Sequence, residues 1–452
     1  MTTIASPPFV LALLGALGCA ALAGCRPGAE QPLAIVVSGD TAGWIAPCSC
    51  AANQSGGLPR RATYVAGLRR QAAVILADAG GAAGGKAGYD RAKFEAILHG
   101  EILMGVAAHN IGAAEALLGP SELRRLARQT GVPLLSANVC DRAGRLVAEP
   151  VRVVVAAGRR IALVGVLAER YATAELQVLP PHQAALDALH AAGNYDAAIV
   201  LAYLPEDELR QFVDVLPEAD AIFGGPTGQP ISPRRIGPAL LASATNKGKF
   251  LVRLDAPESA AAGHWTGRIV ELNEQFADDP QQVANIGRFR QQLAEADFAP
   301  PQTSFAEQWP LPLPAGLTVA GTAACRKCHE EDDGLWRQSK HAAAWKTLTD
   351  SGAHVDPDCQ RCHTTGYGLP GGFTSARHSG ALVNVGCESC HGPSQRHAAQ
   401  PAVPTAYLAQ AKDRCTVCHD RENSPKFSYA SYWKKISHGK SAPPTKRVTP
   451  AR

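Results

Sequence analysis

Short apolar runs alternate with amphipathic stretches between Leu33 and Leu272, and this rhythm predicts an α/β domain. The expected strands are Leu33–Ser38, Val74–Ala77, Ile161–Val166, Ala197–Leu201, Ala221–Phe223, Leu240–Ala242 and Phe250–Leu254. Amphipathic stretches such as Tyr89–Leu103 lie between them and predict helices that cover a sheet.

A change of pattern after this region predicts a domain boundary. Asp278–Phe298 has the periodicity of one helix, and a proline-rich stretch follows that predicts a stiff, extended linker. The prolines are Pro300, Pro301, Pro310, Pro312 and Pro314. We therefore expect an α/β domain over 33–275, a helix and linker over 278–317, and a second domain over 318–442.

The N-terminus has the pattern of an export signal. Phe9–Gly24 is an apolar run of signal-peptide length, too short for a comfortable membrane span. Leu22-Ala23-Gly24-Cys25 resembles the lipobox of bacterial lipoproteins, which implies that residues 1–24 are removed and that Cys25 carries lipid. The preceding Met1–Pro8 departs from this pattern because it contains no Lys or Arg. An uncleaved anchor and a buried N-terminal helix stay open as alternatives.

Composition excludes several classes of protein. The chain has 452 residues, of which 46% are hydrophobic and 19% charged, as in a folded protein of about three units. Its formal net charge of +4 and the lack of like-charge runs give no indication of nucleic-acid binding. Ten of the 13 cysteines lie near the two ends, and only Cys48, Cys50 and Cys140 lie between Arg26 and Gly321.

Four CxxCH motifs carry the chemistry of the C-terminal third. They are Cys325-Arg-Lys-Cys328-His329, Cys359-Gln-Arg-Cys362-His363, Cys387-Glu-Ser-Cys390-His391 and Cys415-Thr-Val-Cys418-His419. In a c-type haem site, two thiols three positions apart bind the two vinyl groups, and the next histidine is the proximal iron ligand. The sequence therefore predicts four covalently attached haem c groups. Two zinc ribbons built from the CxxC pairs would leave the four histidines unexplained.

The side chains available as sixth iron ligands are limited. The two methionines, Met1 and Met104, lie outside the haem region, so His/Met ligation is excluded there. Nine of the 14 histidines follow Gly321, and those beyond the motifs are His341, His354, His378, His397 and His438. Bis-histidine haems would have low potentials, typical of a relay on the reducing side of a respiratory chain. About 33 residues per haem are too few for an ordinary core, so this domain should be small, mostly helical and irregular.

The C-terminal region resembles the nitrifier tetrahaem cytochrome c family, the electron acceptor of hydroxylamine oxidoreductase. The resemblance rests on Trp336, Ser339-Lys340-His341, Ala344, Asp358 to Tyr367, Gly371-Gly372-Phe373, Val385 to Pro393, His397, Tyr432-Trp433 and His438-Gly439. It implies three bis-histidine haems and one five-coordinate haem, with His341, His397 and His438 as distal ligands. His354 and His378 match no ligand position, so they are ordinary polar residues or close the fourth site.

The α/β region resembles the metallophosphoesterase fold of the 5'-nucleotidase type. The matching blocks are Ser38-Gly39-Asp40, Gly56-Gly57-Leu58, Arg60 to Thr63, Asp78-Ala79-Gly80, Gly112 to Glu115, Ser136-Ala137-Asn138 and Gly224-Gly225. Of the eight metal-ligand positions compared, only Asp40 is retained. The others hold Ala42, Gly81, Ala113, Ala114, Tyr203, Pro226 and Gly228, so we expect no two-metal site. His109-Asn110 is either a shifted ligand or a local structural element.

Three cysteines remain in the α/β region. Cys48-Ser-Cys50 precedes Gly56-Gly57, and Cys140 follows Asn138. A disulfide from one of the pair to Cys140, a redox-active or metal-binding CxC, and unpaired structural cysteines all fit an oxidising compartment.

Three functions compete. The first is a periplasmic tetrahaem c-type cytochrome, lipid-anchored to a bacterial membrane, that transfers electrons between redox protein partners. The second is a multihaem reductase or oxidoreductase that acts on a small nitrogen or sulfur compound at a five-coordinate haem. The third, a phosphoesterase, is disfavoured because its metal ligands are missing.

Overall fold

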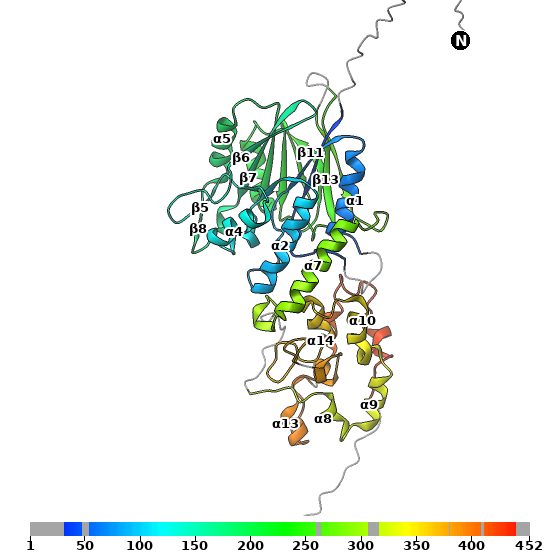
Figure 1. Ribbon diagram of the computed structural model, residues 1–452. Helices are drawn as coiled ribbons and strands as arrows, with labels where there is room; N and C mark the ends of the chain where they lie inside the picture. Colours follow the sequence, from blue (N-terminus) through cyan, green and yellow to red (C-terminus); the bar gives the residue numbers. More distant parts are fainter. Residues whose placement is uncertain are drawn as a thin grey trace, which may run out of the picture.

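The computed structural model describes residues 31–47, 54–258, 264–305, 316–378, 380–407 and 411–439. An α/β domain and a C-terminal domain lie end to end, and helix α7 (Pro280–Ala296) packs on the α/β domain and runs toward the C-terminal domain (Figure 1). Cys25, Cys48, Cys50 and the last three linker prolines are outside the described residues. In the part of the chain that is described, no helix is long and apolar enough to span a bilayer.

Two six-stranded sheets form the centre of the α/β domain. The first has the order β14 (Thr266–Glu271), β13 (Phe250–Asp255), β1 (Leu33–Ser38), β2 (Ala73–Asp78), β3 (Val106–Asn110) and β4 (Leu134–Leu135). The second has the order β11 (Ile231–Ile236), β12 (Ala239–Ser243), β10 (Ala221–Gly225), β9 (Ala197–Tyr203), β7 (Arg159–Leu167) and β6 (Val151–Ala156). A small antiparallel pair, β5 (Val139–Asp141) and β8 (Leu176–Val178), lies beside them. The α/β fold predicted from the apolar runs is confirmed.

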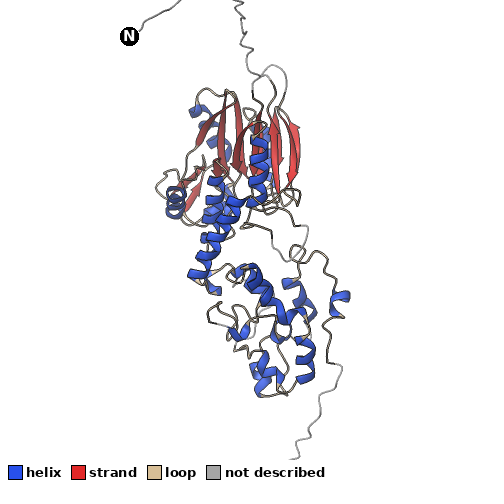
Figure 2. Cartoon of the chain, turned by 45° about the vertical axis from the view of Figure 1, so that its right-hand side comes forward, coloured by secondary structure: helices blue, strands red, loops and turns tan. Residues whose placement is uncertain are grey.

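The central strands are apolar throughout because both of their faces are buried. In β1, Ile35 and Val37 pack between the two sheets, whereas Ala34 and Val36 face the helices. Alternation with period two produces the same division in β9, where Ile199 faces the first sheet. Helices, the two sheets and further helices therefore make four layers, as the view across the strands shows (Figure 2).

The helices fall into two groups. Those on the first sheet include α1 (Leu58–Arg69), α2 (Gly88–Leu103), α4 (Pro120–Thr130) and α7, and the short α3 (Ala113–Ala116) lies beside them. The second sheet is covered by α5 (Pro181–Ala192) and α6 (Glu206–Val215).

Helix α7 is fixed at its start and along its length. The Asp279 carboxylate caps it by accepting hydrogen bonds from the Gln281 and Gln282 amides. The Gln282 and Asn285 side-chain amides then donate to backbone carbonyls of α2, each at 2.8 Å. These buried polar contacts hold α7 against α2.

The C-terminal domain consists of short helices joined by loops. They are α8 (Thr322–Arg326), α9 (Glu330–Arg337), α10 (Ala344–Ser351), α11 (Pro357–His363), α12 (Cys387–His391), α13 (Gln395–Ala399), α14 (Ala411–Cys418) and α15 (Tyr429–Trp433). Few of its described apolar side chains are buried, the largest being Tyr367, Phe373 and Tyr407. The helical and irregular character predicted for this region is confirmed.

Candidate functional site

Each CxxCH motif lies on a helix or at its end. The second motif lies within α11 and the third within α12, whereas the fourth ends just after α14. In the first motif the His329 amide donates to the Cys325 carbonyl at 3.0 Å, which continues the helical turn beyond α8. A helical turn places residues i, i+3 and i+4 on one face, so both thiols and the imidazole of a motif point to the same side.

All four motifs are close together, with Cys390 near Cys415 and Cys418, and two pairs of thiols are hydrogen-bonded. The Cys325 thiol lies beside the Cys387 thiol, so the first motif neighbours the third, and their hydrogen bond lowers the pKa of Cys387 to about 7. The Cys362 and Cys418 thiols are neighbours in the same way, which joins the second motif to the fourth.

Three motif histidines each face a histidine from another segment. The ring centroids of His329 and His397 are 6.2 Å apart, those of His341 and His419 are 6.2 Å apart, and those of His391 and His438 are 5.9 Å apart. A metal–imidazole bond is about 2 Å long and the ring centroid lies roughly 1 Å beyond the bound nitrogen, so two imidazoles on opposite sides of one metal have centroids about 6 Å apart. The three pairs have the separation that an iron between the rings requires.

Backbone and hydroxyl oxygens fix several of these rings through Nδ1. His397 Nδ1 lies 2.7 Å from the Val403 carbonyl, and His438 Nδ1 lies 2.8 Å from the Ile436 carbonyl. His419 Nδ1 lies 3.0 Å from the Ser424 hydroxyl. A hydrogen bond at Nδ1 leaves Nε2 as the metal-binding nitrogen and sets the ring orientation.

The second motif differs from the other three. His363 Nδ1 lies 2.7 Å from the Ala344 carbonyl, as expected for a ligand that binds through Nε2. Among the described residues, however, no histidine ring is found opposite His363. His354 instead packs edge-on against Trp345, and the exposed His378 contacts Ser375 and Asp297.

The α/β domain contains a cavity at the carboxyl ends of its strands. Its volume is about 500 Å³, and it is lined by Asp40, Ala42, Gly81, Ala113, Ala114, Tyr203 and neighbouring residues. The retained Asp40 accepts a hydrogen bond from the Thr245 hydroxyl at 2.6 Å. Burial raises the pKa of the Asp40 carboxyl. One carboxylate among alanines, a glycine and a tyrosine cannot hold two divalent metals.

The two domains resemble different known proteins. Residues 324–392, which contain three of the four motifs, match the family described as cytochrome c554 and c-prime. A curated relative, cytochrome c-554 of Nitrosomonas europaea, is 30% identical over 147 residues, which cover 25% of this chain and 63% of the relative. The C-terminal domain resembles cytochrome c554. We call it the c554-like domain.

Solved structures resemble the α/β domain. A 5'-nucleotidase precursor from Thermus thermophilus has a TM-score of 0.50 at 18% identity, over 58% of this chain and 59% of that one. A calcineurin-like phosphoesterase from Bacillus subtilis has a TM-score of 0.50 at 15% identity, over 58% of this chain and 97% of that one. At these identities the likeness shows the fold alone, so the resemblance to the metallophosphoesterase fold is confirmed and activity does not follow from it.

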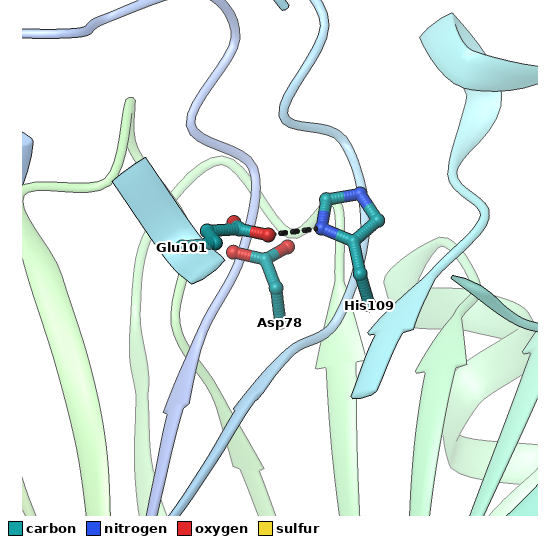
Figure 3. A group of neighbouring side chains, drawn as sticks. All are labelled: Asp78, Glu101 and His109. Atoms are coloured by element: carbon teal, nitrogen blue, oxygen red, sulfur yellow. Dashed lines mark hydrogen bonds and ion pairs between the residues drawn. The ribbon is translucent and has the colours of Figure 1, made fainter. Parts of the chain in front are cut away.

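The α/β domain also contains a buried polar cluster. Asp78, Glu101 and His109 converge from β2, α2 and β3 (Figure 3), and their ligand atoms lie within 4.8 Å of one another. His109 Nδ1 is 2.7 Å from Glu101 Oε2, and Arg61 lies 3.6 Å from Asp78 and 3.8 Å from Glu101. Burial alone would lower the pKa of His109, but the Glu101 carboxylate raises it well above the ordinary value. Glu115 Oε1 also lies 3.8 Å from His109 Nε2, so Arg61 and His109 are paired with three buried carboxylates, and these ion pairs favour a structural role over metal binding.

Asn110, next to His109, is also part of the framework. Its side-chain amide donates to the carbonyls of Ala79, Val166 and Leu201 and so ties the two sheets together. Cys140 is buried on β5. Its pairing with Cys48 or Cys50 concerns residues outside the described ranges and stays a prediction.

One residue that organises the c554-like domain was missed by the sequence analysis. Glu388, inside the third motif, is 3% exposed and accepts hydrogen bonds from the Ala320, Gly321 and Ser394 amides, at 2.7 to 3.1 Å. It ties the segment before the first motif to the third motif. A glutamate between two cysteines carries no separate sequence signal, because any residue fits the x positions of CxxCH.

Proposed function

We propose that the chain is a tetrahaem c-type cytochrome that transfers electrons at the periplasmic side of a bacterial membrane, to which Cys25 anchors it. The observation that carries this is the set of three histidine pairs with ring centroids 5.9 to 6.2 Å apart, each containing one motif histidine. The domains are taken as 33–275, 278–317 and 318–442, after a signal peptide over 1–24.

The residues present fit four haems. Cys325, Cys328, Cys359, Cys362, Cys387, Cys390, Cys415 and Cys418 would form the thioethers, and His329, His363, His391 and His419 would be the proximal ligands. His397, His341 and His438 would be the distal ligands opposite His329, His419 and His391. When bound, each haem supplies a one-electron ferric/ferrous couple.

The chain's own residues would keep these couples close together. The thiol contacts bring the first motif to the third and the second to the fourth. Neighbouring attachment points favour electron exchange within each pair of haems. Rings held through Nδ1 change orientation little, so little reorganisation accompanies electron transfer. Redox proteins would deliver and accept the electrons.

One observation favours a second candidate function, reduction or oxidation of a small nitrogen or sulfur compound. His363 has no opposing histidine among the described residues, so an iron bound there would keep one coordination position open to a small molecule. The Ala344 carbonyl holds the proximal ring through Nδ1.

The mass and the absorption spectrum of the purified mature protein test the proposal. We expect the intact mass to contain four haems, and carbon monoxide to change the reduced spectrum of about one haem in four, because only an open iron binds it. A mass with fewer haems, or a spectrum in which all haems respond, would contradict the arrangement. Turnover of a small nitrogen compound by that haem would favour the second candidate.

A further inference from the structure

Helix α2 of the α/β domain reaches the segment that precedes the second CxxCH motif. The Tyr89 hydroxyl donates to Asp356 Oδ1 at 2.6 Å, and Lys93 Nζ lies 3.3 Å from Asp358 Oδ2. Lys93 also donates to the Tyr89 hydroxyl at 2.9 Å. Tyr89 is 1% exposed and Lys93 8% exposed, so the pair is shielded from water.

The two aspartates belong to the helix that carries the second motif. Asp356 caps α11 by accepting a hydrogen bond from the Asp358 amide at 3.0 Å. Asp358 precedes Cys359 and also accepts a hydrogen bond from Arg361 Nε at 3.0 Å. The α/β domain therefore holds both the start of α11 and the charge beside Cys359.

Other contacts keep the domains in this arrangement. Glu422, three residues after His419, forms ion pairs with Lys247 and with Lys249, the latter at 3.0 Å. On the other side, the Ser375 hydroxyl donates to Asp297 Oδ2 at 2.7 Å. Lys93 is thus fixed by an interface that extends well beyond its own ion pair.

A buried charge near a haem changes its reduction potential. Reduction lowers the charge of the iron centre by one, so a nearby cation favours the reduced form and a nearby anion favours the oxidised form. The effect is larger inside a protein than in water because the effective dielectric constant is lower. Removing Lys93 would also leave Asp358 with only Arg361 as its partner. The loss of the Lys93 cation and the less compensated Asp358 carboxylate would both lower the reduction potential of a nearby haem.

We propose that Lys93 is a positioning residue through which the α/β domain raises the reduction potential of the haem held by Cys359, Cys362 and His363. This rests on the proposed function, because it requires a haem at the second motif. The α/β domain, which lacks its metal ligands, is then a built-in electrostatic partner of the c554-like domain. His363 is the motif histidine that no other histidine ring faces among the described residues, so the haem affected would be the one with an open coordination position.

The test is a redox titration of the full-length, haem-loaded protein in which the high-spin haem is followed by electron paramagnetic resonance. We expect Lys93→Met to lower the midpoint potential of this haem, Lys93→Arg to keep it near the wild-type value, and Lys86→Met to leave it unchanged. Lys86 is the matched control because it is exposed in the segment leading into α2.

A second variant, Asp358→Asn, should shift the midpoint potential of this haem in the opposite direction. Removing the carboxylate should raise the midpoint potential, whereas loosening of the interface would move Lys93→Met and Asp358→Asn in the same direction. Equal shifts in both variants, or an unchanged potential in folded Lys93→Met, would overturn the proposal. An intact mass that lacks a haem on Cys359 and Cys362 would instead contradict the proposed function, so the two failures are distinguishable.

Discussion

The ring of Tyr203 occupies the space beside Gly81 in the α/β cavity. A Cβ atom at position 81 would lie 2.6 Å from Tyr203 Cε2 and 2.9 Å from its hydroxyl. Both residues stand where the resemblance to metallophosphoesterases expects metal ligands. The tyrosine thus fills the space that the missing side chain leaves, and the two substitutions fit each other.

Replacing Gly81 alone by aspartate, a metal-binding side chain, should therefore destabilise the domain without restoring metal binding. Gly81 has φ +78°, which disfavours other residues, and an aspartate side chain at this position would overlap the Tyr203 ring. We expect Gly81→Asp to cost about 3 kcal/mol. Thermal unfolding measures this cost, and metal analysis after incubation with Mn²⁺ or Zn²⁺ measures binding.

Gly84→Asp is the matched control for this variant. Gly84 lines the same cavity, but a Cβ there would meet its nearest neighbour at 3.5 Å, an ordinary contact. It should be the more stable of the two. Wild type and both variants should bind no metal pair and hydrolyse no phosphate ester; metal-stimulated hydrolysis that disappears in Asp40→Ala would contradict this.

The elements that sequence reasoning found and missed differ in burial. β1, β9 and β10 were predicted because strands buried on both faces give apolar runs. β11 lies at a sheet edge, is half exposed and contains Pro233, so it gives no clear apolar run. β6 lies at the other edge and is mostly half-buried, and its run Val153–Ala156 is an apolar signal that the sequence analysis did not use. The fixed spacing of two cysteines and a histidine in the sequence revealed the four CxxCH motifs. Which histidines meet across the fold depends on tertiary packing, which spacing does not encode.

Lys93 illustrates the same limit. It lies with Tyr89, Ile97 and Glu101 on one stripe of α2 at intervals of four, all buried. Two charged residues on an otherwise buried stripe are a usable sequence signal, because buried charges need partners. Asp358, the partner of Lys93, comes from another domain, and His109, the partner of Glu101, comes from the next strand, so both pairings required the structure.

The His109 imidazolium should make the stability of the α/β domain depend on pH. A pKa raised in the folded state means that the stabilisation is fully present below the unfolded value of about 6.5 and is lost as pH rises through the folded value. We expect the free energy of unfolding to fall above about pH 6.5, and His109→Gln to reduce that dependence. Denaturant unfolding at several pH values measures it. The partly exposed His99, changed to Gln, is the control, and an equal loss of pH dependence there would contradict the role of His109.

Cys25→Ser should separate anchoring from haem attachment. The thiol of a lipobox cysteine carries the lipid, so serine should release the protein from the membrane or block its processing, while the CxxCH cysteines still bind haem. Membrane fractionation, haem staining and mass spectrometry of the N-terminus measure the three properties. A wild-type protein that keeps Met1, or that starts beyond Cys25 without lipid, would refute the anchor.

Substitution of the distal histidines should change spin states one haem at a time. In His397→Ala the thioethers still hold the haem, and His329 remains as its axial ligand, so one low-spin iron should become high-spin. His341→Ala and His438→Ala should each do the same at a different haem, because their rings face His419 and His391.

Electron paramagnetic resonance counts the high-spin and low-spin haems, with one high-spin haem expected in the wild type and two in each variant. His378→Ala should match the wild type, since its side chain is 75% exposed and contacts Asp297 in the interface. Four low-spin haems in the wild type would show that another ligand closes the second site, and an unchanged spectrum in His397→Ala would refute the pairing with His329.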